Sequence, residues 1–271
     1  MPAAIPFVEA IQSLVKKGLL PTSMSSAEIR ALDAGVRRQS LFSARTTLTG
    51  YLNDIKSTVE SIVNPKQVER VMEDGSKRMV TEGFNPASAR EVLRQKLRDL
   101  GYKPAEDEAG SITDLGSDAR LNLVIKTNTD MAQGAGQFIQ QNAFAETLDA
   151  YPALELFRLE DRKEPRNWPQ RWRIASQVAG DAKAAGVLEF TGRMVALKSS
   201  GIWQALGDGA GGYDDTLGNP YPPFAFNSGM FTEEVARDSA ERLGLIEPGE
   251  VARASEFDWG SIFHTPLEAA A

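Results

Sequence analysis

The sequence has no cysteine and only one histidine among its 271 residues. Without cysteine the chain has no disulfide bonds and no thiolate metal sites, and a single histidine excludes a Cys/His zinc cluster within it. That residue, His264, stands alone in a mixed tail, where a histidine is far more often a surface group than a catalyst. We therefore expect stability to come from packing and no catalytic role for His264.

Positively charged residues are fewer than negatively charged ones. The chain carries 30 lysines and arginines against 37 aspartates and glutamates, which gives a net charge of -7 and a pI near 5.0. Proteins that hold duplex nucleic acid through its phosphates gain affinity from clustered Lys and Arg. We therefore expect no specific nucleic-acid binding. Hydrophobic residues make up 42% of the sequence, enough for the core of a soluble, globular protein.

Long apolar runs and enzyme motifs are missing as well. The amino-terminal stretch MPAAIPFVEAIQSLVKKGLLP places its lysines after its apolar residues, unlike a secretory signal, and is too charged to span a membrane. The motifs HExxH, GxSxG and the P-loop do not occur in the sequence. The sequence thus predicts a chain that is not an enzyme and that stays in a cytoplasm without a membrane anchor.

Two acidic clusters and one glycine run are candidate ligand sites. Residues 106–108 are adjacent carboxylates in a loop and lack the calcium-loop spacing, so we interpret them as solvated. Asp214 and Asp215 have no further ligands nearby in the sequence. The glycines at 207–212 lack the Lys-Ser/Thr pair and the preceding strand of a phosphate loop. We interpret the glycine run as a flexible linker, with no metal and no cofactor. The whole stretch 207–230 is expected to be an ordered loop or a set of tight turns, because its aromatic residues need cover.

The stretch 118–142 is predicted to be the central helix. One face carries residues at three- and four-residue spacing, namely Leu121, Val124, Asn128, Met131, Ala135, Phe138 and Asn142. An amide on a buried face needs hydrogen-bond partners, so we expect Asn128 to fix register against a neighbouring segment. Gly134 and Gly136 each cost about 1 kcal/mol inside a helix, and close approach of another backbone is the usual compensation.

The part before residue 110 is predicted to be a helical arm and bundle. Its longest element is an arm at 26–63, whose apolar residues keep helical spacing almost without a break and form a coiled-coil-like seam. Such an arm could self-associate. The predicted elements of this part are helices at 7–20, 26–63, 66–82 and 86–101, followed by an acidic turn region at 102–116.

Residues 111–246 are predicted to form a mixed domain around the central helix, and 247–271 a tail. Its expected elements are strands at 150–159, 172–178 and 188–197, a short helix or turn at 181–185, and a helix from Thr232 to Gly244. Thr232 is a good helix cap, and the two glutamates after it suit the positive end of a helix dipole. The fold class that follows is α+β, with a long-helix front and a small sheet.

Arginines and tryptophans are interleaved in one run after the first of these strands: Arg158, Arg162, Arg166, Trp168, Arg171, Trp172 and Arg173. Cations interleaved with aromatic rings can stack bases or bind phosphates. Carboxylates occur in the same stretch, at Glu155, Glu160, Asp161 and Glu164. We therefore interpret the run as a surface held by salt bridges and cation-π contacts rather than as a nucleic-acid site.

Short motifs in the second half stand in a recognisable order. The helix stretch Leu123–Gln137 has a basic-Thr-polar triplet at Lys126–Asn128, followed by Ala and Gly. A strand ending in Arg, a Pro-Arg pair with an aromatic, and a Trp…Pro-Pro-aromatic-Asn turn come after it. The residues concerned are Thr127, Asn128, Thr129, Gly134, Gly136, Arg158, Pro165, Arg166, Trp168, Trp203, Pro222, Pro223, Phe224 and Asn227. In this order they resemble the Mu F-like (SPP1-related) family of phage head morphogenesis proteins, over roughly residues 85–230.

The sequence departs from that family at specific positions. Lys126 and Asn128 replace the usual Arg and Glu of the helix triplet, and no His follows Pro165-Arg166. Ser228-Gly229 stand where many members carry a Cys-Arg-Cys ending. Metal or thiol chemistry associated with those residues in other members is therefore not expected here.

The resemblance implies a minor head protein. Such a protein is recruited by the portal, contacts portal and capsid proteins, is present in few copies, and stays in the capsid interior or neck of the virion after assembly in the host cytoplasm. Packaged DNA would lie nearby without specific binding, because an acidic surface repels it. We expect Thr127, Asn128 and Thr129 to hold the turn around Pro222, Phe224 and Asn227, with the Arg/Trp run on its other side.

Two alternatives belong to other classes. One is an enzyme or toxin-like domain acting on nucleotides, with Arg158, Arg171 and the glycine-rich loop as a phosphate cradle. The other is a major subunit of a shell. Nucleotide binding would distinguish the first, and copy number in a purified particle the second.

Overall fold

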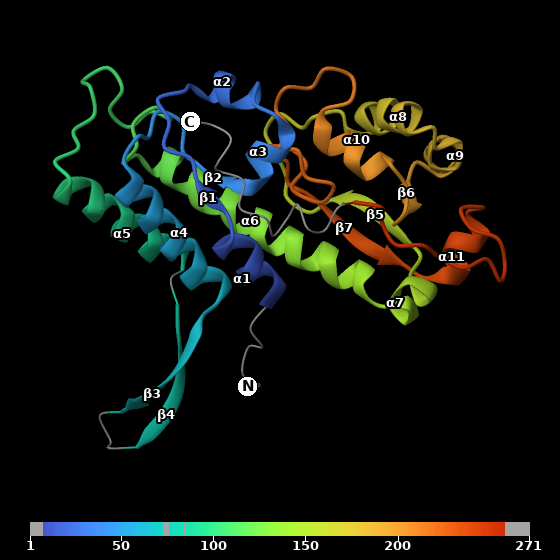
Figure 1. Cartoon of the computed structure of the whole chain (residues 1–271), viewed down its shortest axis with the longest axis horizontal. Helices are drawn as coiled ribbons and strands as arrows, with labels where there is room; N and C mark the ends of the chain where they lie inside the picture. The colour runs from blue at the N-terminus through green and yellow to red at the C-terminus, as the bar shows by residue number, and fades with distance from the viewer. Residues whose placement is uncertain (1–7, 73–75, 84, 258–271) are drawn as a thin grey trace. The chain divides into compact units, whose positions relative to one another are not determined.

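The computed structural model describes residues 8–72, 76–83 and 85–257 (Figure 1). About 47% of the chain is helical and 13% is in strands, which confirms the predicted α+β fold. Its longest described helix is α6 (Asp118–Ala143), in agreement with the predicted central helix. The chain divides into two compact units, and the boundary between them passes through α6 after Gly136. The predicted division near residue 110 instead places all of α6 in one domain.

The first unit combines a helical core with two small pairs of strands. Its described elements are α1 (Val8–Val15), β1 (Gly18–Leu19), β2 (Ser40–Leu41), α4 (Thr49–Val63), β3 (Lys66–Val71), β4 (Lys77–Glu82), α5 (Pro86–Asp99) and the first part of α6. Strands β1 and β2 pair in parallel, whereas β3 and β4 form an antiparallel hairpin.

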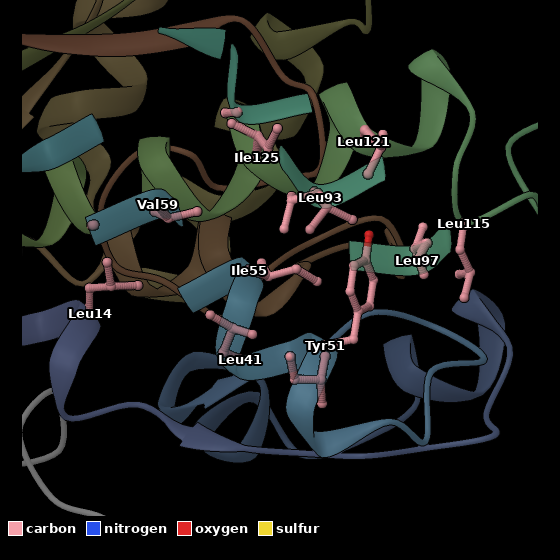
Figure 2. Close-up of a cluster of buried hydrophobic side chains, with 14 of the residues drawn as sticks. Leu14, Leu41, Tyr51, Ile55, Val59, Leu93, Leu97, Leu115, Leu121 and Ile125 are labelled. Carbon is pink, nitrogen blue, oxygen red and sulfur yellow. The ribbon is translucent and has the colours of Figure 1, made fainter. Parts of the chain in front are cut away.

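Helices α4 and α5 supply the centre of the core of this unit, as the side chains in Figure 2 show. Three- and four-residue spacing places one face of each helix in that core, through Leu52, Ile55 and Val59 of α4 and Ala89, Leu93 and Leu97 of α5. Asn85 begins α5, since its Oδ1 accepts hydrogen bonds from the backbone N–H groups of Ala87 and Ser88 at 3.0 and 2.9 Å. The predicted helix after Asn85-Pro86 is confirmed.

The predicted continuous helix at 26–63 is wrong. Its place is taken by α2 (Ser26–Arg30), α3 (Ala34–Gln39), β2 and α4. The chain turns at Arg45, whose φ of 57° is a left-handed conformation incompatible with a continuing right-handed helix. The seam residues of α4 pack inside the core of their own unit, so the helical spacing reflects internal burial. Self-association through such an arm loses its basis.

The predicted helix at 66–82 is also wrong, because these residues form the β3–β4 hairpin. The sequence carries two signals that favour strands here. Valines lie within β3, and Asp74-Gly75 stands between the two strand segments, a dipeptide typical of hairpin turns. The apolar residues were too sparse to decide between helical and strand periodicity.

The second unit surrounds a three-stranded antiparallel sheet. Its described elements are α2, α3, the end of α6, α7 (Ala145–Ala150), β5 (Ala153–Arg158), α8 (Trp168–Ala179), α9 (Ala182–Thr191), β6 (Met194–Leu197), α10 (Ile202–Asp208), β7 (Met230–Val235) and α11 (Arg237–Arg242). Strand β5 is central, between β6 and β7. The predicted strand at 150–159 is confirmed in β5. The strand predicted at 188–197 is confirmed only for its second half, in β6, because residues 188–191 belong to helix α9.

Both faces of this sheet are buried, as the two-residue period of a strand allows. On one face Leu154, Leu156 and Ala196 pack with the tryptophans of α8 and α10. On the other face Ala153 and Val195 pack with a second, smaller cluster. The sheet therefore fixes the positions of α8 and α10.

Two predicted elements of this unit are wrong in type. The predicted strand at 172–178 is part of α8, which begins where the Asn167 Oδ1 accepts from the Gln170 N–H at 3.0 Å. The helix expected from Thr232 to Gly244 is strand β7 in its first part, because that backbone pairs with β5 from Arg158↔Met230 to Ala153↔Val235. Its second part is confirmed by α11 (Arg237–Arg242). The residues expected at 181–185 as a short helix or turn belong to the longer α9.

The remaining expectations concern loops and the tail. Residues 102–116 contain turns but no helix or strand, as predicted. Within the part of the chain that the structure describes, no helix has both the length and the apolarity needed to cross a membrane. His264 lies outside the described residues.

Candidate functional site

Asp215 lies at the centre of a polar cluster in the second unit. Its carboxylate accepts two hydrogen bonds from the Arg171 guanidinium, at 2.8 and 3.1 Å, and forms a salt bridge with Arg166 Nε at 2.5 Å. Burial alone would raise the pKa of the Asp215 carboxyl, but the hydrogen bonds and charges of Arg171 and Arg166 outweigh it and hold the pKa below its usual range. Asp215 is therefore an anion that joins α8 to the loop after α10.

Aromatic rings complete the surroundings of Arg171. Its guanidinium lies over the ring of Tyr213, 4.0 Å from the centroid, and 5.2 Å from that of Trp168. Farther along the run, Arg162 pairs with Glu160 at 2.6 Å and Arg173 with Glu189 at 2.5 Å. The interpretation of the Arg/Trp run as held by salt bridges and cation-π contacts is confirmed.

Three tryptophans and a phenylalanine form an apolar ring cluster next to this polar cluster, made of Trp168, Trp172, Trp203 and Phe224. Trp203 lies 5.4 Å from Trp172 in an edge-on arrangement and 6.2 Å from Phe224 in a stacked one, measured between ring centroids. Trp168 lies 6.5 Å from Phe224. The indole of Trp203 also donates to the Leu197 carbonyl at 2.8 Å, which ties the rings to the end of β6.

The proline-aromatic turn is held by arginines from the other end of the run. Arg166 donates to the carbonyls of Phe226 and Asn227 at 2.7 and 3.3 Å, and Arg162 Nε donates to Asn227 at 3.0 Å. Arg158 in turn donates to the Arg166 carbonyl at 3.3 Å. Asn227 has a φ of 51°, a conformation that asparagine tolerates better than most residues.

Most predicted motif residues of this unit meet in one place. Those in the cluster or its turn are Arg158, Arg166, Trp168, Trp203, Pro222, Pro223, Phe224 and Asn227. Pro222 and Pro223 are buried, whereas Pro165 is exposed. Residues from 158 to 227 are thus brought together in the polar cluster around Asp215 and the proline-aromatic turn.

The glycine run allows two backbone segments of the loop to pack closely against each other. A Cβ at Gly207 would lie 1.9 Å from the Asn219 carbonyl oxygen, so that only glycine fits beside this backbone. Asn219 is fully buried and donates from its amide to the Pro223 carbonyl at 3.1 Å. The run is therefore part of the ordered loop expected for 207–230, and the interpretation of the glycines as a flexible linker is wrong.

The helix triplet has a different environment. The Asn128 amide is buried and donates to the Val124 carbonyl at 2.9 Å, one turn back in the same helix. Thr127 and Thr129 are partly buried, as is Gly134, whereas Gly136 is buried. The predicted hold of these residues on the proline-aromatic turn stays a prediction.

In the second unit, α6 reaches the turn through another residue. The ring of Phe138 lies 5.3 Å from that of Tyr221, which precedes Pro222. Asn142 bonds to the Phe138 carbonyl and accepts from the Ser255 N–H, both at 2.9 Å. Phe138 was on the predicted apolar face, but its contact with position 221 has no signal in the sequence.

Sequence reasoning also missed the arginines of α2 and α3. Arg37 donates to the Thr216 carbonyl, Arg38 donates to the Gly218 carbonyl at 2.5 Å, and Arg30 lies 3.6 Å from the Asp214 carboxylate. Burial lowers the pKa of Arg37. These contacts join residues about 180 positions apart, so no local pattern predicts them.

Lys198 is the second buried charge of this unit that the sequence did not identify. Its side chain is fully buried, and Nζ donates to Glu234 at 2.7 Å and to the Gln141 carbonyl at 2.8 Å. Burial lowers the pKa of Lys198, although the hydrogen bond to Glu234 opposes that effect. Glu234, expected in a helix, instead serves as the partner of Lys198 on strand β7.

The acidic clusters hold arginines in the structure. Glu108 pairs with Arg45 at 3.1 Å, and Asp214 and Asp215 pair with arginines as described. In residues 8–72, 76–83 and 85–257, no group of three or more His, Cys, Asp or Glu side chains is placed to hold a metal ion.

Comparison of the chain with protein-family models, with curated proteins and with solved structures found no match.

Proposed function

We propose that this chain is a minor head protein of the phage head morphogenesis type, a structural component that associates with the portal during capsid assembly. The observation that carries the proposal is the pair of hydrogen bonds from Arg166 to the carbonyls of Phe226 and Asn227. They join two of the motifs on which the resemblance depends, although 60 positions separate them in the sequence. The motifs thus act together as a frame for the turn.

The chemistry of the cluster favours a structural role. Arg171 already has a bidentate carboxylate partner, and its guanidinium lies over the rings of Tyr213 and Trp168. A nucleotide phosphate would have to displace Asp215 to reach it, losing a charge-assisted pair. The proposed role therefore requires no cofactor and no catalytic residue, and its partners are the portal and capsid proteins.

The acidic balance of the chain fits the proposed place in the virion. With a net charge of -7, the chain repels the phosphates of packaged DNA, so a position in the capsid interior or neck does not require it to bind the genome. Assembly would take place in the host cytoplasm.

The test is co-purification with the portal protein of the same phage. We expect the chain to be retained by the tagged portal and to be present in purified particles at far fewer copies than the shell subunit, as measured by quantitative mass spectrometry. Retention by the portal together with a shell-like copy number would support the major-subunit alternative. Loss of both portal binding and particle incorporation would contradict the proposal, and tight binding of any nucleotide from a panel would favour the enzyme alternative.

A further inference from the structure

The β3–β4 hairpin is a two-stranded ribbon with exposed apolar residues. Figure 1 shows it extending from α4 and α5, the helices that precede and follow it. Val71 and Met79 are each 62% exposed. An isolated two-stranded hairpin is only marginally stable, and an unpaired edge presents free backbone donors and acceptors. Among the described residues no third strand joins this sheet.

The hydrogen-bond pattern identifies which backbone groups point outward. The Met72 N–H donates to the Ser76 carbonyl at 2.8 Å, so this opposed pair is a hydrogen-bonded one. Hydrogen-bonded and non-bonded pairs alternate along an antiparallel ladder. The pairs Arg70↔Arg78 and Val68↔Val80 are therefore hydrogen-bonded as well. It follows that Lys77, Met79 and Thr81 direct their N–H and C=O groups away from β3.

We propose that two copies of this chain pair through the outer edges of β4, antiparallel and centred on Val80. This register is compatible with the outward groups, because it places Met79 of one copy opposite Thr81 of the other as a hydrogen-bonded pair. It also places Arg78 of each copy opposite Glu82 of the other. Opposite charges at such non-hydrogen-bonded positions stabilise a sheet.

Other registers of the same edge are less complementary. Centring the pair on Met79 keeps the hydrogen bonds but places Arg78 opposite Val80, without charge pairing. The charge pattern of the edge, with a basic residue before Val80 and an acidic one after it, is what selects the Val80 register.

The β3 edge lacks this property. Centring two β3 strands on Val68 opposes Lys66 to Arg70, centring them on Glu69 opposes Glu69 to itself, and centring them on Arg70 opposes Arg70 to itself. Like charges directly opposite destabilise pairing. The self-complementary edge would therefore be used once per chain, and the assembly closes as a two-fold dimer instead of growing as a fibre.

One feature of the single hairpin becomes understandable in the dimer. Arg70 and Arg78 are directly opposite within each copy, an arrangement that costs stability in an isolated ribbon. In the proposed register, position 82 of the other copy, a glutamate in the sequence, is opposite Arg78 on the side away from Arg70. The proposal does not depend on the proposed role in phage heads.

A proline scan of the two edges tests the proposal on the full-length chain. Met79→Pro removes an outward N–H of β4, whereas Glu69→Pro removes one of β3, and neither N–H belongs to the β3–β4 ladder. Sedimentation velocity from about 1 to 100 μM, a range that reveals dimers of modest affinity, should show a dimer for the unchanged chain and for Glu69→Pro. Met79→Pro should be monomeric.

Charge reversal tests the register. Arg78→Glu should weaken dimerisation about tenfold or more, because both attractive pairs become repulsive, while placing an acid opposite Arg70 should favour the hairpin of the single chain. Combining it with Glu82→Arg and Lys66→Glu should restore the dimer, since the third change keeps opposite charges at the Lys66↔Glu82 pair of the single hairpin. A monomeric unchanged chain, a dimer that persists in Met79→Pro, or equal loss in both proline variants would overturn the proposal, as would failure of the triple reversal to restore pairing.

Discussion

Replacing Trp203 by alanine is expected to lower the free energy of unfolding of the second unit by about 3–5 kcal/mol, the usual loss for a large buried aromatic side chain. Trp203 is 2% exposed and contacts both Trp172 and Phe224. Its indole N–H bonds to the Leu197 carbonyl, so truncation leaves a cavity and an acceptor without its partner. Truncation should therefore destabilise the sheet, through the end of β6, as well as the ring cluster.

Urea unfolding followed by circular dichroism measures this loss. Phe190→Ala is the matched control, because it removes an aromatic ring that is 91% exposed, and such surface changes alter stability by about 0.5 kcal/mol or less. A Trp203→Ala variant as stable as Phe190→Ala would show that the ring cluster is not the core of this unit.

Replacing Asp215 by asparagine is the second expected large effect. The amide is neutral and leaves Arg166 and Arg171 without their shared counter-charge. Breaking a buried ion pair costs about 3–5 kcal/mol, and because the Asp215 side chain is 22% exposed we expect about 2–3 kcal/mol after solvent screening. Asp214→Asn is the control, since its side chain is 82% exposed, and it should change stability by about 0.5 kcal/mol or less.

The pH dependence of this effect has a defined sign. The pKa of the Asp215 carboxyl is lowered in the folded chain, so its contribution to stability is complete above the unfolded value of about 3.9 and is lost as the pH falls through the folded value. The difference in unfolding free energy between the unchanged chain and Asp215→Asn should be constant near neutral pH and should shrink in that acidic range. A difference that does not change with pH would contradict the assigned role of the carboxylate.

Local signals in the sequence predicted those elements whose stability is local. The α5 start at Asn85-Pro86 and the apolar face of α6 were found because capping and periodicity lie within a few residues of each other. Errors arose where long-range pairing decides. Residues 230–235 have a helix-like start in sequence, yet their hydrogen bonds to β5 make them a strand.

The site follows the same rule. Carboxylates beside the Arg/Trp run indicated that its charge is neutralised, and the nearby Glu160 does pair with Arg162. The main acceptor, however, is Asp215, 44 positions after Arg171. No spacing rule connects two residues across such a distance, so the sequence could indicate salt bridging in general but not its centre.

The order of synthesis gives the α2–α3 segment a consequence for folding. Residues 26–39 leave the ribosome first, but the carbonyls to which Arg37 and Arg38 donate belong to residues made 179 and 180 positions later. The growing chain therefore carries this segment without its docking site until nearly all of the second unit has emerged. Completion of that unit must await the synthesis of residues 214–218, so a nascent chain halted before residue 214 would keep its early arginines in water.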